Sequence, residues 1–162
     1  MKLVIQDLDE EQLSWGKDTV VISKQEPIHN CIGCFGCWVK SPGQCVIQDG
    51  YQNIGEYFSK TEHLTIVSKC TYGGYSPFVK NVLDRAISYI HPFFTIRAGK
   101  MHHQHRYSNH IPVTVYFYGE DITAHEKETA KRLVLANKIN LDEAAAKVYF
   151  VKDVEELKGV LG

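Results

Sequence analysis

Four cysteines gather in one short stretch of the chain, at positions Cys31, Cys34, Cys37 and Cys45. The first three form two consecutive C-x2-C steps, which is the opening spacing of a ferredoxin-type run that holds an iron–sulfur cluster. Gly33 and Gly36 lie between them and allow the backbone to curl tightly. Four thiolates could therefore face one centre.

Three other readings of these cysteines stay open. Reduced cysteine packs as a small apolar residue, so the loop could be a structural element anchored by Ile32, Phe35 and Trp38. A redox-active thiol pair is a second reading. Zinc is a third and fits less well, because structural zinc sites usually separate two ligand pairs further. With Cys70 the chain has five cysteines, and this odd number argues against a closed disulfide framework.

A second candidate site is the loop Lys69–Ser76 between an apolar run and an amphipathic segment. Gly73 and Gly74 permit close backbone approach to a ligand, and Tyr72 and Tyr75 offer flat faces to an aromatic ring. The helix that follows would present free amide donors. The alternative is a tight strand-to-helix turn with surface tyrosines.

A third cluster contains His102, His103 and His105, followed by Arg106. Such residues could bind a metal or an anionic group such as a phosphate. They lie in what we expect to be a long connection from His91 to His110, so an exposed loop or a subunit contact is the alternative.

The elements that must position these residues alternate between short apolar runs and helical patterns, which is typical of a parallel sheet covered by helices. We expect five strands, at Lys2–Gln6, Thr19–Ser23, Leu64–Ser68, Val113–Tyr118 and Val148–Val151. We expect helices at Tyr51–Lys60, Pro77–Ile90, Thr123–Asn137 and Asp153–Val160. Ser76 and Pro77 form a helix start, and Thr123 with Glu126 forms a capping box.

This rhythm predicts one α/β domain over residues 1–162 with a doubly wound sheet of strand order 2-1-3-4-5 and helices on both faces. Ligands of such sheets bind beyond the carboxyl ends of the strands. We expect the loops Asp7–Gly16, Lys24–Cys45, Lys69–Ser76 and Gly119–Thr123 to lie there. The first crossover is short, with room for one or two helical turns around Glu10–Trp15.

Composition excludes several classes of function. The net charge is −1 and no basic stripe exists, which argues against nucleic-acid binding. No apolar run is long enough to cross a membrane, and the amino terminus does not resemble a signal peptide, so a cytoplasmic protein is expected. The nucleotide-binding and hydrolase motifs G-x-G-x-x-G, G-x-x-x-x-G-K-[ST] and G-x-S-x-G are absent from the sequence.

Two stretches resemble a known group of proteins. The segment from Cys31 to Asp49 and the segment from Tyr72 to Arg85, with Lys80, Asp84 and Arg85, are similar to motifs of the NAD(P)H-dependent FMN reductases and iron–sulfur flavoproteins. These belong to the flavodoxin-like superfamily, whose fold is a three-layer α/β sandwich. The resemblance covers most of the chain from about His29 onward.

The resemblance implies an FMN cofactor. Its flavin ring would be walled by the following residues: Thr71, Tyr72, Gly73, Gly74, Tyr75, Tyr118 and Gly119. It also implies that Cys31, Cys34, Cys37 and Cys45 would hold a 4Fe-4S cluster. One departure stands out, because these families bind the FMN phosphate in a Ser/Thr/Gly-rich loop after the first strand. Here Asp7–Gln12 carries four carboxylates, which would repel a phosphate. FMN would then need other donors, for which the segment His102–Arg106 of this chain or a neighbouring one is one source.

The leading functional hypothesis is therefore a flavin-dependent oxidoreductase that takes electrons from NAD(P)H and passes them to a small-molecule acceptor. No side chain is assigned as a catalytic acid or base. The alternative is a non-catalytic electron carrier or binding module that has lost flavin. The aromatic segment from Tyr89 to Phe94 suggests a subunit contact, so a homo-oligomer is expected.

Overall fold

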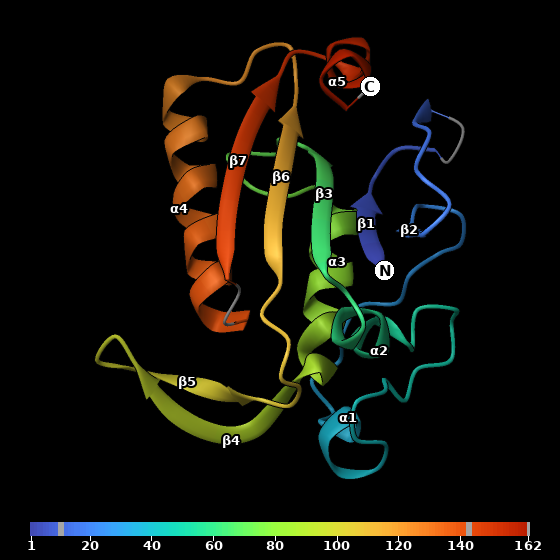
Figure 1. Cartoon of the computed structure of the whole chain (residues 1–162), viewed down its shortest axis with the longest axis vertical. Coiled ribbons are helices and arrows are strands. Elements are labelled where there is room, and N and C mark those ends of the chain that lie inside the picture. Colours follow the sequence, from blue (N-terminus) through green and yellow to red (C-terminus); the bar gives the residue numbers. More distant parts are fainter. Residues whose placement is uncertain (10–11, 142–143, 162) are drawn as a thin grey trace.

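A single parallel sheet organises the protein. The computed structural model describes residues 1–9, 12–141 and 144–161. Five strands are hydrogen-bonded in the order β2-β1-β3-β6-β7, which confirms the predicted order 2-1-3-4-5 (Figure 1). Their bounds are β1 (Lys2–Gln6), β2 (Thr19–Ile22), β3 (His63–Lys69), β6 (Pro112–Tyr118) and β7 (Ala145–Val151).

The main helices begin where their caps predict. In α3 (Pro77–Arg85) the Ser76 side chain accepts a hydrogen bond from the Val79 amide, with Pro77 in the first turn. Before α4 (Ala124–Leu141) Thr123 and Glu126 bond each other's backbone amides, which is the expected capping box. The other helices are α1 (Gly36–Val39), α2 (Ile54–Ser59) and α5 (Val154–Leu161).

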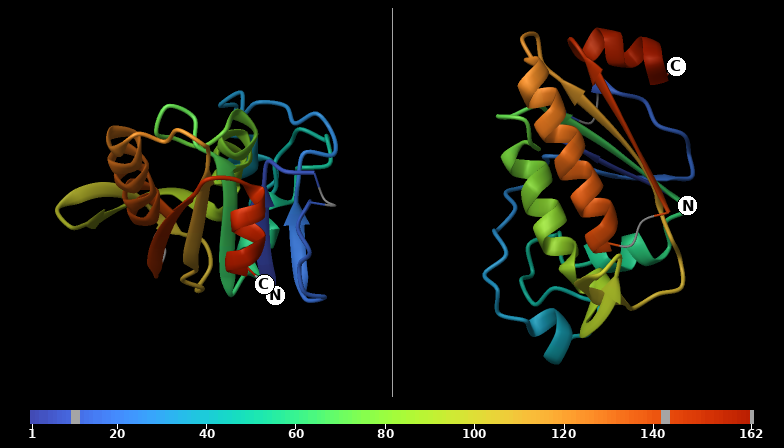
Figure 2. Two further views of the ribbon diagram at one scale, coloured as in Figure 1. Left: turned by 90° about the horizontal axis from the view of Figure 1, so that it is seen from above. Right: turned by 90° about the vertical axis from the view of Figure 1, so that its left-hand side faces the viewer.

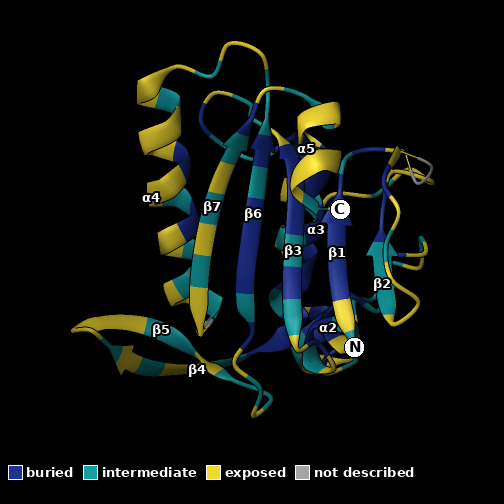
Figure 3. Cartoon of the chain, turned by 45° about the horizontal axis from the view of Figure 1, so that its top comes forward, coloured by how far each residue is buried: buried dark blue, intermediate teal, exposed yellow. Residues whose placement is uncertain are grey.

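The helices lie on both faces of the sheet, but unequally (Figure 2). The main core packs α2, α3 and α4 against one face, where Ile5, Ile66 and Val115 are almost fully buried. On the other face α5 packs through Leu157 onto Val67 and Val151, together with Leu8 and Leu13 of the first connection. The central strands β1, β3 and β6 are accordingly the most buried part of the molecule (Figure 3).

The expectation of a long connection between His91 and His110 is wrong, because most of this segment forms a β-hairpin. Strands β4 (Ile90–Arg97) and β5 (Lys100–His105) pair antiparallel and project from the body of the molecule (Figure 1). Ala98 and Gly99 both have positive φ, as a two-residue hairpin turn requires. The helix expected from Pro77 to Ile90 is correspondingly shorter, since α3 ends at Arg85 and a 3-10 helix over Ala86–Tyr89 leads into β4.

Other boundaries differ modestly from expectation. Strand β7 begins three residues earlier than predicted, and α4 extends four residues further, to Leu141. The short helix expected around Glu10–Trp15 lies partly outside the described residues, and residues 14–16 have no regular structure. Helix α1 was not predicted; it lies within the segment from Cys31 to Cys45, which we call the cysteine loop.

Candidate functional site

An open cleft of about 430 Å³ lies at the carboxyl ends of β1, β3 and β6. It sits between β1 and β3, where the strand order of the sheet reverses, which is the usual ligand position in such folds. We call it the carboxyl-edge cleft. Its lining residues are Asp7, Lys24, Glu26, Pro27, Ile28, Lys69, Thr71, Ser76, Pro77, Phe78, Asn81 and Tyr118.

The Asp7 carboxylate occupies the hydrogen-bond donors at this edge. One oxygen accepts from the backbone amide of Lys69 at 2.9 Å, and the other accepts from the Tyr118 hydroxyl at 3.1 Å. Burial and then the neighbouring Asp7 raise the pKa of Tyr118, so its phenol stays protonated. A phosphate bound after β1 would therefore meet an anion in place of free donors.

Of the turn Thr71–Tyr75 within the loop Lys69–Ser76, Thr71 lines the cleft, as do the loop's end residues Lys69 and Ser76. Thr71 and Gly74 exchange two backbone hydrogen bonds of 2.9 Å, which closes the turn. Tyr72 lies at the tip with positive φ and is 92% exposed, away from the cleft. Gly73 packs against α4, and Tyr75 packs on the core ring of Phe117 with centroids 5.3 Å apart.

Of the seven residues that the resemblance assigned to a flavin ring, two line the same cleft. Thr71 comes from the loop after β3, and Tyr118 ends β6. Gly119 instead packs against Ile122 and lines a separate hollow near Lys152. Sequence reasoning did not single out the opposite wall of the cleft, which Ile28, Phe78 and Asn81 form.

The four clustered cysteines line one small cavity, which we call the cysteine cavity. Its walls are Cys31, Ile32, Gly33, Cys34, Phe35, Cys37, Cys45, Ile47, Arg85 and Ile87. Cys31 and Cys34 are exposed, Cys45 is half-buried and Cys37 is buried. Burial raises the pKa of the Cys37 thiol, and the neighbouring thiols of Cys45, Cys31 and Cys34 raise it further.

Local backbone geometry shapes this cavity. Gly33 and Phe35 have positive φ, so the chain reverses sharply before the single turn of α1. The Gly36 amide donates to Cys34 Sγ at 3.5 Å, and a Cβ on Gly36 would meet Val46 at 2.5 Å. Trp38 fixes the loop to the body of the protein, because its indole donates to the Ile90 carbonyl at 2.9 Å.

Helix α1, which carries Cys37, lies at the end of the sheet away from the carboxyl ends of the strands (Figure 1). The cysteine cavity and the carboxyl-edge cleft therefore lie at opposite ends of the sheet. The expectation that the whole loop Lys24–Cys45 lies at the carboxyl edge is therefore wrong. Its first residues, up to Ile28, line the cleft beside the start of α3. The chain then runs alongside α3, and the cysteines come to lie beside Arg85, the last residue of that helix.

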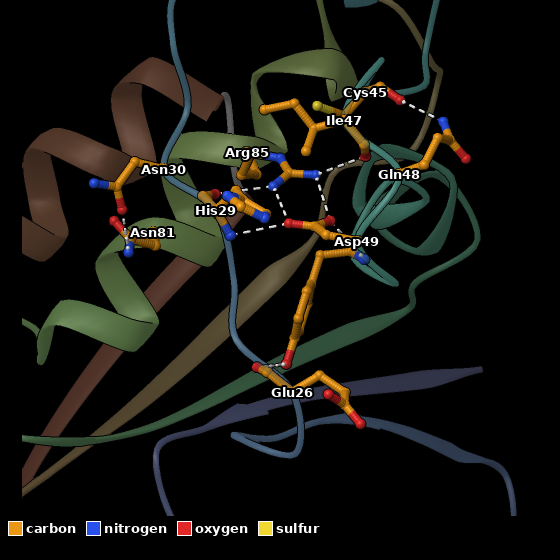
Figure 4. Close-up of polar contacts among 10 residues, drawn as sticks. Glu26, His29, Asn30, Cys45, Ile47, Gln48, Asp49, Asn81 and Arg85 are labelled. Carbon is orange, nitrogen blue, oxygen red and sulfur yellow. Dashed lines mark hydrogen bonds and ion pairs between the residues drawn. The ribbon is translucent and has the colours of Figure 1, made fainter.

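A buried ion pair joins the two ends of the cysteine loop. The Arg85 guanidinium donates to both carboxylate oxygens of Asp49, at 2.8 and 3.0 Å, and to the carbonyls of His29 and Ile47 (Figure 4). The two side chains are 0% and 6% exposed. From the sequence, Arg85 was identified only through the family resemblance. No sequence pattern indicated that Asp49 would form an ion pair with Arg85.

The histidine cluster lies on strand β5 at the same end as the cysteines. His103 packs between the rings of Trp38 and Phe94, with both centroid separations 5.0 Å. Arg106 donates to the carbonyls of Ser88 and Ile90. Within this chain the segment His102–Arg106 is therefore not positioned to supply phosphate donors to the carboxyl-edge cleft.

In the part of the chain that the structure describes, no three His, Cys, Asp or Glu side chains converge on a single metal ion. The four thiols share a cavity without meeting at one point, which does not suit a preformed zinc site. In a 4Fe-4S cluster the ligands are Cys thiolates, and hydrogen bonds to the sulfurs tune it. Four thiols in one mostly apolar cavity and a hydrogen bond from the Gly36 amide to Cys34 Sγ fit that chemistry. None of the described helices is long and apolar enough to cross a membrane.

Comparison with solved structures defines the class of fold. The Trp repressor binding protein from Bacillus subtilis superposes with a TM-score of 0.55 and 12% identity, over 99% of this chain and 94% of that one. An FMN-dependent NADH-azoreductase from Bacillus anthracis, solved in complex with FMN, superposes with a TM-score of 0.53 and 11% identity, over 98% and 92%. The chain therefore has a flavodoxin-like fold, as the resemblance implied. No protein-family model and no curated protein matches the sequence.

Proposed function

We propose that this protein is an oxidoreductase that binds a flavin in the carboxyl-edge cleft and passes electrons from NAD(P)H to a small-molecule acceptor. The observation that carries the proposal is that Thr71 and Tyr118, both expected beside a flavin, line one cleft at the point where the strand order reverses. The fold likeness to a solved FMN-dependent NADH-azoreductase supports it. At about 430 Å³ the cleft has the size of a small-molecule site.

The residues of the cleft divide into an apolar wall and a polar rim. Ile28, Pro77 and Phe78 supply flat apolar surface for a ring, while Lys24 and Asn81 supply hydrogen-bond donors. A bound flavin supplies the hydride and electron chemistry, and the protein orients it and excludes water. Tyr118 stays protonated beside Asp7, donates a hydrogen bond to that carboxylate and is not proposed as a catalytic acid.

The Asp7 carboxylate opposes binding of the phosphate group, which is what FMN has and riboflavin lacks. It already accepts from the Lys69 amide, so a phosphate gains no free donor there and meets a like charge. We therefore propose that the cleft selects the ring and gives little preference to FMN over riboflavin.

A fluorescence titration of the protein with FMN and with riboflavin tests this. We expect both to bind with similar affinity to the wild type. In Asp7→Asn, which removes the charge but keeps a side-chain acceptor, we expect FMN to bind about tenfold more tightly than riboflavin, equivalent to about 1.4 kcal/mol. Glu128→Gln changes the net charge equally on the exposed side of α4 and should leave both affinities unchanged. Failure of both flavins to bind would overturn the proposal.

A second candidate function is favoured by the cysteine cavity: an electron carrier with a 4Fe-4S cluster. Its support is that Cys31, Cys34, Cys37 and Cys45 all line one cavity, whose other walls are apolar residues, Gly33 and the buried cation Arg85. A bound cluster would supply one-electron transfer, and the four thiolates would hold it.

Anaerobic reconstitution with iron and sulfide tests the second candidate. We expect about four irons and four acid-labile sulfides per chain in the wild type. Cys37→Ser should lose this stoichiometry, whereas Cys70→Ser should keep it, because Cys70 lies outside the cavity. If the wild type takes up no iron, the cysteines return to the readings of structural thiols or a redox-active thiol pair.

A further inference from the structure

The cysteine loop is held at both ends by one buried cation. Before the loop, the His29 carbonyl accepts from Arg85 Nη1 at 2.9 Å; after it, the Ile47 carbonyl accepts from Nη2 at 3.2 Å. Asp49 closes the arrangement, because its carboxylate accepts from the amides of His29 and Tyr51 as well as from Arg85. Arg85 and Asp49 therefore fix where the loop begins and ends.

One donor of Arg85 is left over. A guanidinium has five N–H groups, and the four on the terminal nitrogens make the bonds to His29, Ile47 and Asp49. The fifth, Nε–H, is buried and has no partner within hydrogen-bond distance in the described part of the protein, while the Cys45 thiol is a neighbouring acceptor for this guanidinium. A buried donor without a partner destabilises the folded state, so its retention needs a reason.

The position of Arg85 gives that reason. Its side chain is fully buried and forms part of the wall of the cysteine cavity, together with Cys45 and Ile47 (Figure 4). An arginine guanidinium is not deprotonated in proteins, so Arg85 is a cation beside the Cys45 thiol. Asp49 is not among the residues that line the cavity, and its carboxylate balances the charge of Arg85.

We propose that Arg85 is a positioning residue for a cluster held by the four cysteines, and that its Nε–H donates to a sulfur of that centre. The inference rests on the second candidate function and goes beyond it by assigning a residue that sets the reduction potential. Hydrogen bonds to cluster sulfurs tune the potential. A donor stabilises the more negative, reduced form, so Arg85 makes the centre easier to reduce.

Two variants separate this role from a structural one. Arg85→Lys keeps a cation near Asp49 but has no Nε–H, whereas Asp49→Asn loosens the same clamp and leaves the Arg85 donor in place. We expect the potential of Arg85→Lys, followed by electron paramagnetic resonance, to fall so that the reduced-to-oxidised ratio at a fixed potential drops about tenfold. This corresponds to about 59 mV for a one-electron couple. The potential of Asp49→Asn should not become more negative.

A measurement on the wild type keeps the proposal testable if Arg85→Lys does not fold. Protein labelled with ¹⁵N only in arginine should show hyperfine coupling between one arginine nitrogen and the reduced cluster. Absence of this coupling, or an unchanged potential in a folded, iron-loaded Arg85→Lys protein, would overturn the assignment of Arg85. If the wild type binds no iron at all, it is the cluster proposal that fails.

Discussion

At the scale of single residues, the Asp49–Arg85 pair is a buried ion pair, with side chains 6% and 0% exposed. Burial raises the pKa of Asp49, but hydrogen bonds from Arg85 and from the amides of His29 and Tyr51 outweigh it and lower the pKa to about 2. The ordinary value in an unfolded chain is about 3.9. The carboxylate therefore stabilises the folded state when it is ionised, and its protonation favours unfolding.

This pair predicts a pH dependence of stability. Because the folded pKa is depressed, the contribution is complete above about pH 5 and is lost as the pH falls toward 2, by about 2 kcal/mol. Asp49→Asn should lack this part of the acid dependence and should lose about 3 kcal/mol at neutral pH, since Arg85 is left as a buried, unpaired cation. Urea unfolding between pH 2 and pH 7 measures both effects.

The matched control is Glu56→Gln, which removes an exposed carboxylate paired with Lys60 on the surface. Its stability should stay within about 0.5 kcal/mol of the wild type. An Asp49→Asn protein as stable as this control would show that the ion pair contributes no net stability.

At the scale of secondary-structure elements, the turn between β3 and α3 both lines the cleft and packs against α4. Gly73 has positive φ, and a Cβ there would lie 2.8 Å from Thr129 and 3.0 Å from the Glu126 carbonyl oxygen. Both atoms belong to α4, so the turn and that helix are in direct contact. Glycine at this position is explained by the close approach of two backbones.

Gly73→Ala should therefore destabilise the protein by about 1–3 kcal/mol, through a strained φ and a clash with α4. Gly159→Ala is the control, because Gly159 lies inside α5 with open space around it. That change should be neutral or stabilise the fold by about 0.5–1 kcal/mol. Thermal unfolding of the two variants measures the difference, and equal melting temperatures would contradict this account of the turn.

The elements were predictable where local signals agree with burial. Apolar runs gave all five strands of the sheet, and the Ser76 and Thr123 caps gave the starts of the two main helices. The hairpin was not predicted because neither strand alternates cleanly between apolar and polar residues, and Ala98-Gly99 is not one of the dipeptides typical of a two-residue turn. The cysteines were expected at the carboxyl edge but lie beside Arg85, at the other end of α3. The sequence of the loop Lys24–Cys45 does not indicate the path that the loop takes along the protein.

At the scale of the whole molecule, the surface near the cysteine cavity is unusually apolar. Phe93, Phe94, Ile96 and Met101 on the projecting hairpin are all at least 60% exposed. Rings of Phe35, Trp38, His103 and Phe94 follow one another at 5.0–5.3 Å, from the cysteine loop to the hairpin. A two-stranded ribbon is marginally stable alone in water, so further contacts would stabilise it.

We propose that this surface associates with a second copy of the chain, in line with the expected homo-oligomer. Sedimentation at micromolar concentration should give a dimer mass for the wild type and a monomer mass for Phe94→Glu with Ile96→Lys. Val160→Lys changes another exposed apolar residue, on α5, and the protein should remain dimeric. A monomer mass for the wild type would contradict the proposed dimer.

The fold could be predicted from the sequence far better than the sites. Strand order follows from the alternation of strands and helices along the chain, and the resemblance pointed to the same architecture. The lining of the carboxyl-edge cleft depends on how the segment 24–28 passes α3, which no local pattern encodes. Thr71 and Tyr118 were found because they end adjacent strands; Ile28 and Asn81 were not, because they come from separate segments.

Reduction of bound flavin by a nicotinamide donor tests the central proposal most directly. The protein is loaded with flavin without oxygen, freed of excess and mixed with NADH or NADPH, and the visible flavin absorbance is followed. We expect the flavin to stay bound and its absorbance to bleach with at least one donor, then to recover when an acceptor is added. A protein that retains no flavin, or retains flavin that neither donor reduces, would contradict the assignment.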